Sequence, residues 1–78
     1  MDYIALGKDI RELRRKRGFT QEKLAEFADL SVPYISHLER GTKTPSLAVL
    51  VRLAENLGVT VDRLLSGNQI VDKAAYYP

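Results

Sequence analysis

Apolar side chains recur at helical spacing along most of the chain, and this periodicity limits the possible folds more than any other feature. Leu6, Ile10 and Leu13 share one stripe near the start, and residues 47–57 carry a broader one. No stretch alternates apolar and polar residues as a half-buried strand does. Each periodic segment is short, so packing must hold the helices together, because short helices are marginal alone. The pattern predicts an all-α fold.

Stop and cap signals divide the chain into five helices. Gly18, Gly41 and Gly58 each follow a periodic segment, where a left-handed residue commonly ends a helix. Thr20 and Ser31 precede periodic segments and are good N-cap residues. The expected helices cover residues 6–17, 20–29, 31–40, a segment capped by Ser46 or Thr44 that runs to residue 57, and 61–65 capped by Thr60.

Length and composition indicate one globular domain. The 78 residues allow a single domain, placed at residues 1–67 and followed by a tail of uncertain structure at 68–78. Apolar residues make up 45% and charged residues 28%, which is an ordinary globular balance. No apolar run approaches the roughly 20 residues of a membrane span, and the N-terminus lacks a signal-peptide layout. The chain has no cysteine, so a reducing cytoplasm is the expected location.

The sequence offers no site for catalysis or for a metal ion. There is one histidine, no cysteine and no cluster with ligand spacing. No nucleophile lies beside a base, and no glycine-rich phosphate loop is present. We therefore expect no enzymatic activity, no cofactor, no metal and no small-molecule ligand.

The segment SVPYISHLERG, residues 31–41, predicts a helix with a polar outward side. On a helical wheel Ile35 and Leu38 point towards the core. The opposite side carries Pro33, Ser36, His37 and Arg40. The connection from the preceding helix, residues 29–31, is tight, and two helices joined in this way cross steeply as a helix-turn-helix. The second helix of such a pair can enter a DNA major groove, where its outward side reads base edges and phosphates.

Residues 18–67 resemble the lambda-repressor/Cro-like (Xre) helix-turn-helix family. The matching segments are GFTQEKLAEFADLSVPYISHLERG and TPSLAVLVRLAENLGVTVDRLL. The resemblance implies a compact five-helix lambda-repressor-like domain. It also implies a sequence-specific regulator of transcription that binds double-stranded DNA, with repression as the expected mode.

The family's DNA contacts, carried over by position, centre on the third helix. The implied base readers are Val32, Pro33, Ser36 and His37. The implied backbone contacts are Gln21, Ser31, Tyr34, Arg40 and Lys43, with Arg14 from the first helix. Two departures stand out: Asp29 occupies a turn position that is usually glycine, and the third helix has no Gln, Asn or Arg in its first turn. Aspartate tolerates a left-handed conformation better than most residues.

Simpler interpretations of some residues stay open. The five cations between residues 11 and 17 suit a solvated helix end, because they face the negative end of the helix dipole. Tyr34 can simply cover the edge of the core, and His37 can be an ordinary surface residue. Glu39 is expected to pair with a nearby cation, since it would repel phosphate. Two rival functions remain: a protein-interaction module of the same fold, such as an antitoxin-like or anti-repressor partner, and a nonspecific nucleic-acid binder.

Assembly follows from the small size of one recognition helix. It contacts only a few base pairs, so we expect a homodimer, at least on DNA, on a near-palindromic site. One candidate interface is the fifth helix with Val59, Val61 and Arg63. The other, which we favour, is the tail with Ile70, Val71, Tyr76 and Tyr77.

Overall fold

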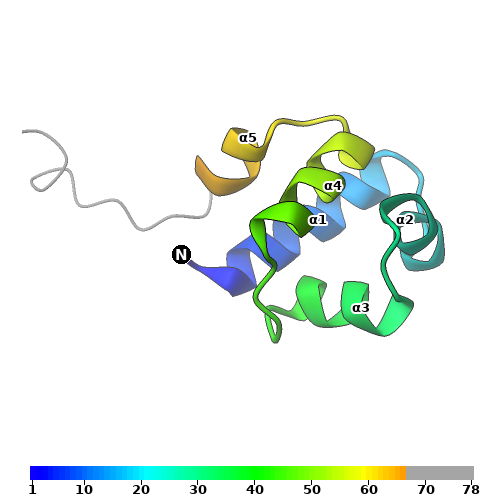
Figure 1. The fold of residues 1–78 in the computed structure, drawn as a ribbon, viewed down its shortest axis with the longest axis horizontal. Helices are drawn as coiled ribbons and strands as arrows, with labels where there is room; N and C mark the ends of the chain where they lie inside the picture. Colours follow the sequence, from blue (N-terminus) through cyan, green and yellow to red (C-terminus); the bar gives the residue numbers. More distant parts are fainter. Residues whose placement is uncertain (67–78) are drawn as a thin grey trace, which may run out of the picture.

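The computed structural model describes residues 1–66, and this part of the chain forms five α-helices and no β-strand (Figure 1). The helices are α1 (Tyr3–Lys16), α2 (Gln21–Ala28), α3 (Val32–Arg40), α4 (Leu47–Leu57) and α5 (Val61–Ser66). The predicted five-helix, all-α fold is confirmed. The prediction that the tail at 68–78 mediates pairing lies outside the described residues.

The helices begin where a side-chain oxygen can accept a hydrogen bond from an unpaired first-turn amide. Thr20 Oγ1 accepts from the Lys23 amide at 3.1 Å, and Ser31 Oγ accepts from the Tyr34 amide at 3.2 Å. Ser46, not Thr44, caps α4. Thr60 Oγ1 accepts from the Arg63 amide at the start of α5.

The start of α1 differs from its predicted position. The helix begins at Tyr3, three residues before the expected start at residue 6. Asp2 is the N-cap, and its Oδ1 accepts a hydrogen bond from the Ala5 amide at 3.0 Å. This cap adds one turn, residues 3–5, before the predicted start of the helix.

Four left-handed residues end the helices or begin the turns that follow them. Gly18, Gly41 and Gly58 have φ between 72° and 75°. Asp29 has φ 55° and is the only non-glycine residue with positive φ in residues 1–66. The prediction of a left-handed Asp29 is therefore confirmed. Arg52 of α4 holds this turn, since its Nη1 donates to the carbonyl oxygens of Ala28 and Asp29, each at 3.3 Å.

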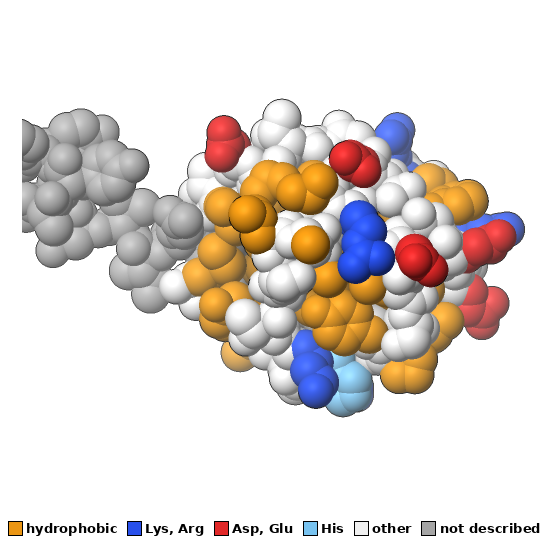
Figure 2. All heavy atoms as spheres, viewed as in Figure 1, with side chains coloured by type: hydrophobic (Ala, Val, Ile, Leu, Met, Phe, Trp, Pro, Cys, Tyr) orange, Lys and Arg blue, Asp and Glu red, His pale blue; other side chains and the backbone are white. Residues whose placement is uncertain are grey.

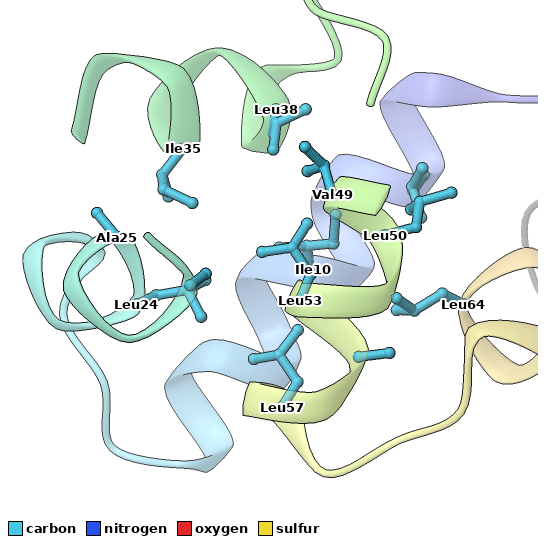
Figure 3. Close-up of a cluster of buried hydrophobic side chains, with 13 residues drawn as sticks. Ile10, Leu24, Ala25, Ile35, Leu38, Val49, Leu50, Leu53, Leu57 and Leu64 are labelled. Carbon is cyan, nitrogen blue, oxygen red and sulfur yellow. The ribbon is translucent and has the colours of Figure 1, made fainter. Parts of the chain in front are cut away.

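The helices pack in a cycle around one core. α1 contacts α3, α3 contacts α2, α2 contacts α4, α4 contacts α5, and α5 returns to α1. Figure 3 shows the core side chains pointing inward from these elements, with Ile10, Leu53 and Leu64 fully buried. Gly7 lets α1 approach α3 closely, because a Cβ there would lie 2.6 Å from the Glu39 carbonyl oxygen and would also clash with that of Leu38. The core thus fixes α3 by its inner side and leaves its outer side exposed.

The end of α5 is tied to α1 by an exposed ion pair. Arg63 donates to both carboxylate oxygens of Asp9, at 2.8 and 3.2 Å. The hydrogen bond to Asp9, and then its negative charge, raise the pKa of Arg63. Arg63, which we considered as an interface residue, therefore already has a partner within its own chain. Among residues 1–66, no helix combines the length and the apolar character needed to cross a membrane.

Candidate nucleic-acid interface

The outward side of α3 is polar, as the helical wheel predicts. Ile35 and Leu38 are buried in the core, whereas Val32, Pro33 and Arg40 are exposed. Ser36 and His37 are partly exposed between them. Figure 2 shows the histidine in pale blue beside a basic side chain, at the edge of the molecule that α3 forms in Figure 1. This side offers hydroxyl, imidazole and guanidinium groups to a partner.

The turn between α2 and α3 sets how α3 is presented. Asp29 reverses the chain in the left-handed conformation, and the Leu30 amide then donates to the Ala25 carbonyl at 2.8 Å. Ser31 begins the next helix at once as its N-cap. α2 and α3 are thus joined by a short, hydrogen-bonded turn, which holds α3 at a fixed angle with its outer side exposed.

A buried ion pair fastens α3 to α1. Arg14 Nε lies 2.7 Å from Glu39 Oε2, and Arg14 Nη2 lies 3.1 Å from Oε1. Arg14 Nη1 also donates to the Phe19 carbonyl oxygen at 2.7 Å. The two side chains are only 9% and 3% exposed. The prediction that Glu39 pairs with a nearby cation is confirmed.

This geometry corrects the role predicted for Arg14. We expected Arg14 to contact DNA phosphates, but the residue is buried and each of its three nitrogens donates to a protein oxygen. A phosphate contact would require Arg14 to leave Glu39 as an unpaired buried charge, which is costly. Arg14 therefore supports the interface from inside and is not part of its surface.

Gln21 connects the buried pair to the surface. Its Nε2 donates to Glu39 Oε1 at 3.2 Å, and the side chain is partly buried. An amide nitrogen carries two hydrogens, so one remains for an external acceptor. Glu39 therefore fixes Gln21 with its donor group at the start of α2, where the helix dipole also favours an anion.

The remaining predicted contact residues surround α3. Ser31 is exposed, and its Oγ is engaged in capping the helix. Tyr34 is partly buried and packs against the core, which agrees with its simpler interpretation as a core-edge residue. Lys43 is exposed in the loop that follows α3. Apart from Arg14, every predicted contact residue has some exposure, and these residues lie on α3 or beside its two ends.

Sequence reasoning missed Thr42. Its Oγ1 lies 2.8 Å from His37 Nδ1 and donates to the His37 carbonyl oxygen at 3.1 Å. The sequence does contain a signal for this contact, since a threonine directly follows Gly41. A left-handed residue at a helix end folds the next residue back over the last turn of the helix. Thr42 thereby contacts one of the predicted base readers.

The cations at the end of α1 divide into different roles. Arg14 is buried, whereas Arg15, Lys16 and Arg17 are exposed. A Cβ at Gly58 would lie 2.5 Å from Arg17 Nη2, which places this guanidinium over the C-terminal end of α4. That end carries partial negative charge, so Arg17 is well placed to stabilise α4.

Comparison with known proteins finds a matching family model and similar sequences. A helix-turn-helix family model matches residues 10–64. The chain is 50% identical over 64 residues to the HTH-type transcriptional regulator DdrOP3 of Deinococcus deserti, covering 82% of this chain and 50% of that protein. It is 34% identical to the immunity repressor protein of Bacillus phage phi105, covering 87% of this chain and 47% of the repressor. The chain thus spans about half the length of these two curated relatives.

A solved structure with bound DNA has the same fold. It is the crystal structure of SinR, a master regulator for biofilm formation, in complex with DNA. The TM-score is 0.74 and the sequence identity is 33%, and the match covers 77% of this chain and 97% of that chain.

Proposed function

Because the chain belongs to the lambda-repressor/Cro-like (Xre) helix-turn-helix family, we propose that it binds double-stranded DNA sequence-specifically and regulates transcription, with repression as its mode. The observation that carries this proposal is the outward side of α3, which presents polar groups from a helix that the core and a buried ion pair hold in place. A solved structure of a similar fold in complex with DNA supports the DNA binding itself.

In this proposal α3 lies in the major groove and its outward side chains read base edges. The base readers are Val32, Pro33, Ser36 and His37. The backbone contacts are Gln21, Ser31, Tyr34, Arg40 and Lys43. Val32 and Pro33 are apolar, so they contact a thymine methyl group or exclude a base by shape. The polar discrimination then falls mainly on His37 and Ser36.

We further propose that the protein acts as a homodimer on DNA and resides in the cytoplasm with the DNA that it regulates. Two copies place two α3 helices in successive major grooves, about 34 Å apart, and double the number of contacted bases. Occupation of a promoter by this dimer would exclude the transcription machinery. The phage repressor among its relatives supports this mode.

The proposal is tested by selecting duplexes from a random pool and titrating the enriched duplex by fluorescence anisotropy. Lys43→Ala should weaken binding to every duplex to a similar degree, because a phosphate contact carries no sequence information. Lys16→Ala is the matched control. Lys16 is exposed and lies on the opposite side of α1 from Gly7, which packs against α3. The two residues are nine apart, and nine steps of about 100° make two and a half turns.

Different outcomes separate the rival functions. Equal losses for the two lysine variants would mean that binding is only a response to net charge, as in a nonspecific binder. No enrichment and no duplex affinity would reject DNA binding and leave the protein-interaction module. An enriched near-palindrome with a loss confined to Lys43→Ala would support the proposed function.

A further inference from the structure

The end of α3 holds the His37 ring through Thr42. Gly41 is left-handed, with φ 75°, and folds the chain back so that the Thr42 amide donates to the His37 carbonyl oxygen at 3.0 Å. The same fold brings Thr42 Oγ1 to 3.1 Å from that carbonyl and to 2.8 Å from His37 Nδ1. The ring is therefore fixed by a side chain that is itself fixed by the helix end.

These two short contacts determine which ring nitrogen carries the hydrogen. A hydroxyl has one hydrogen, and a carbonyl oxygen can only accept. When the Thr42 hydroxyl donates to the His37 carbonyl, it presents lone pairs to Nδ1, and Nδ1 must then donate. If the Thr42 hydroxyl donated to Nδ1 instead, Thr42 Oγ1 and the His37 carbonyl oxygen would lie 3.1 Å apart with no hydrogen between them. In neutral His37, Nδ1 is therefore the protonated nitrogen, and Nε2 is an acceptor.

We propose that Thr42 is a positioning residue that makes His37 a reader of amino groups in the major groove. This inference rests on the proposed DNA binding. The amino groups there are N6 of adenine and N4 of cytosine, whereas guanine and thymine present acceptors. An Nε2 acceptor forms a hydrogen bond with an amino group and meets a lone pair on O6, N7 or O4. Thr42 thereby sets which edge of the base pair His37 selects, without touching the DNA base.

The tautomer is measured first, without DNA. The chain has a single histidine, so a long-range ¹⁵N–¹H spectrum reports His37 alone. At about pH 8.5, where an imidazole is neutral, the wild type should show the hydrogen on Nδ1. Thr42→Val should shift the population towards the Nε2–H form, and Thr42→Ser should retain the wild-type spectrum. An Nε2–H wild type, or a Thr42→Val spectrum identical to the wild type, would overturn the positioning role.

Base analogues then test the reading role. His37→Ala identifies the base pair that the ring reads, as the position whose preference is lost in selection. Replacing the amino base of that pair by purine or pyrimidin-2-one, which lack the amino group, should weaken wild-type binding about 3- to 10-fold, the size of one neutral hydrogen bond. His37→Ala, measured on the same duplexes, should show only the effect of weaker base pairing. The loss attributed to the hydrogen bond is the part that the wild type shows in excess of this variant. Thr42→Val should lose most of the discrimination, and Thr42→Ser should keep it.

The opposite chemistry would contradict the inference. Sensitivity to a 7-deaza purine at that pair, without sensitivity to loss of the amino group, would mean that Nε2 donates. A selection in which His37→Ala changes no position would reject His37 as a reader while leaving the proposed function intact. A protein that enriches no duplex would reject the proposed function and this reading role together, and the tautomer spectrum would still judge Thr42.

Discussion

At the scale of single residues, the most consequential group is a carboxylate that never reaches the surface. Glu39 accepts from Arg14 and from Gln21, so one side chain links α1, the start of α2 and the end of α3. Within residues 1–66, every buried side-chain nitrogen and oxygen has a hydrogen-bond partner. Removing one partner of such a buried pair leaves an uncompensated charge, so the pair constrains how the three helices are arranged.

The first prediction concerns this pair. Glu39→Ala leaves the Arg14 charge buried without a partner and should lower the free energy of unfolding by about 3–5 kcal/mol in urea denaturation. Replacing both residues by Met should cost much less than the sum of the single changes, because no charge is left unpaired. Lys23→Ala, which removes the exposed pair with Glu26, is the control and should cost less than about 1 kcal/mol. A small effect of Glu39→Ala would show that the Arg14 guanidinium can reorient into solvent at little cost.

The second prediction concerns Asp29. Asp29→Gly relieves a left-handed aspartate and should leave stability unchanged or raise it by up to about 1 kcal/mol, since the flexibility of glycine in the unfolded chain offsets part of the gain. The Arg52 hydrogen bonds go to backbone oxygens and are retained. The Asp29 carboxylate also lies 4.0 Å from Arg52 Nη1, but it is fully exposed, so the loss of this ion pair should cost little. Loss of its negative charge should also strengthen DNA binding. Thermal unfolding that shows clear destabilisation would assign the carboxylate a structural role.

At the scale of helices, the sequence predicted most of the fold because its signals are local. Thr20, Ser31 and Thr60 cap the predicted helices α2, α3 and α5. Gly18, Gly41 and Gly58 follow the ends of α1, α3 and α4. These signals depend on neighbouring residues only, so they can be read without a tertiary structure. The early start of α1 was missed because the cap at Asp2 precedes the apolar stripe.

The errors at the site have a different origin. An arginine among four other cations reads as a phosphate contact, and only the packing of α1 on α3 shows that Arg14 meets Glu39, 25 residues away. The link between Gln21 and Glu39 spans 18 residues and is equally invisible to a local pattern. The outward side of α3 was predictable because helical periodicity alone assigns its residues to a side.

The third prediction compares two helix ends with the same backbone conformation. Gly18 and Gly41 have φ 74° and 75°, so an alanine should cost each a similar strain of about 1–2 kcal/mol. A Cβ at Gly18 meets nothing within 4 Å, whereas at Gly41 it would lie 2.7 Å from Ile4 Cα. Gly41→Ala should therefore destabilise the domain more than Gly18→Ala in urea denaturation. Equal effects would mean that the start of α1 yields to the end of α3 at little cost.

At the scale of the whole molecule, net charge is a weak guide to binding. The chain carries only +2, and its exposed cations lie partly on the far side of α1. Affinity for DNA should instead follow the number of phosphates that the few cations beside α3 neutralise.

The fourth prediction is the salt dependence. With Arg14 buried, Arg40 and Lys43 remain as phosphate-contacting cations in each copy. A dimer then neutralises roughly four phosphates, and the logarithm of the association constant should fall with the logarithm of salt concentration with a slope near −4. Including Arg14 would give about six phosphates and a slope near −5. Arg40→Ala and Lys43→Ala each remove two cations from the dimer, so each variant should make the slope shallower by about two. This result would support the count, and a salt-independent affinity would reject it.

The central claim is that the outward side of α3 reads base sequence, and one comparison tests it most directly. Wild type and His37→Ala are titrated by fluorescence anisotropy, at one salt concentration, against the selected duplex and a scrambled duplex of equal composition. We expect the wild type to prefer the selected duplex by a factor on the order of 10³ or more. His37→Ala should weaken binding to the selected duplex by about 1–3 kcal/mol and leave the scrambled duplex almost unaffected. Equal wild-type affinities for the two duplexes, or an equal loss on both with His37→Ala, would contradict the claim.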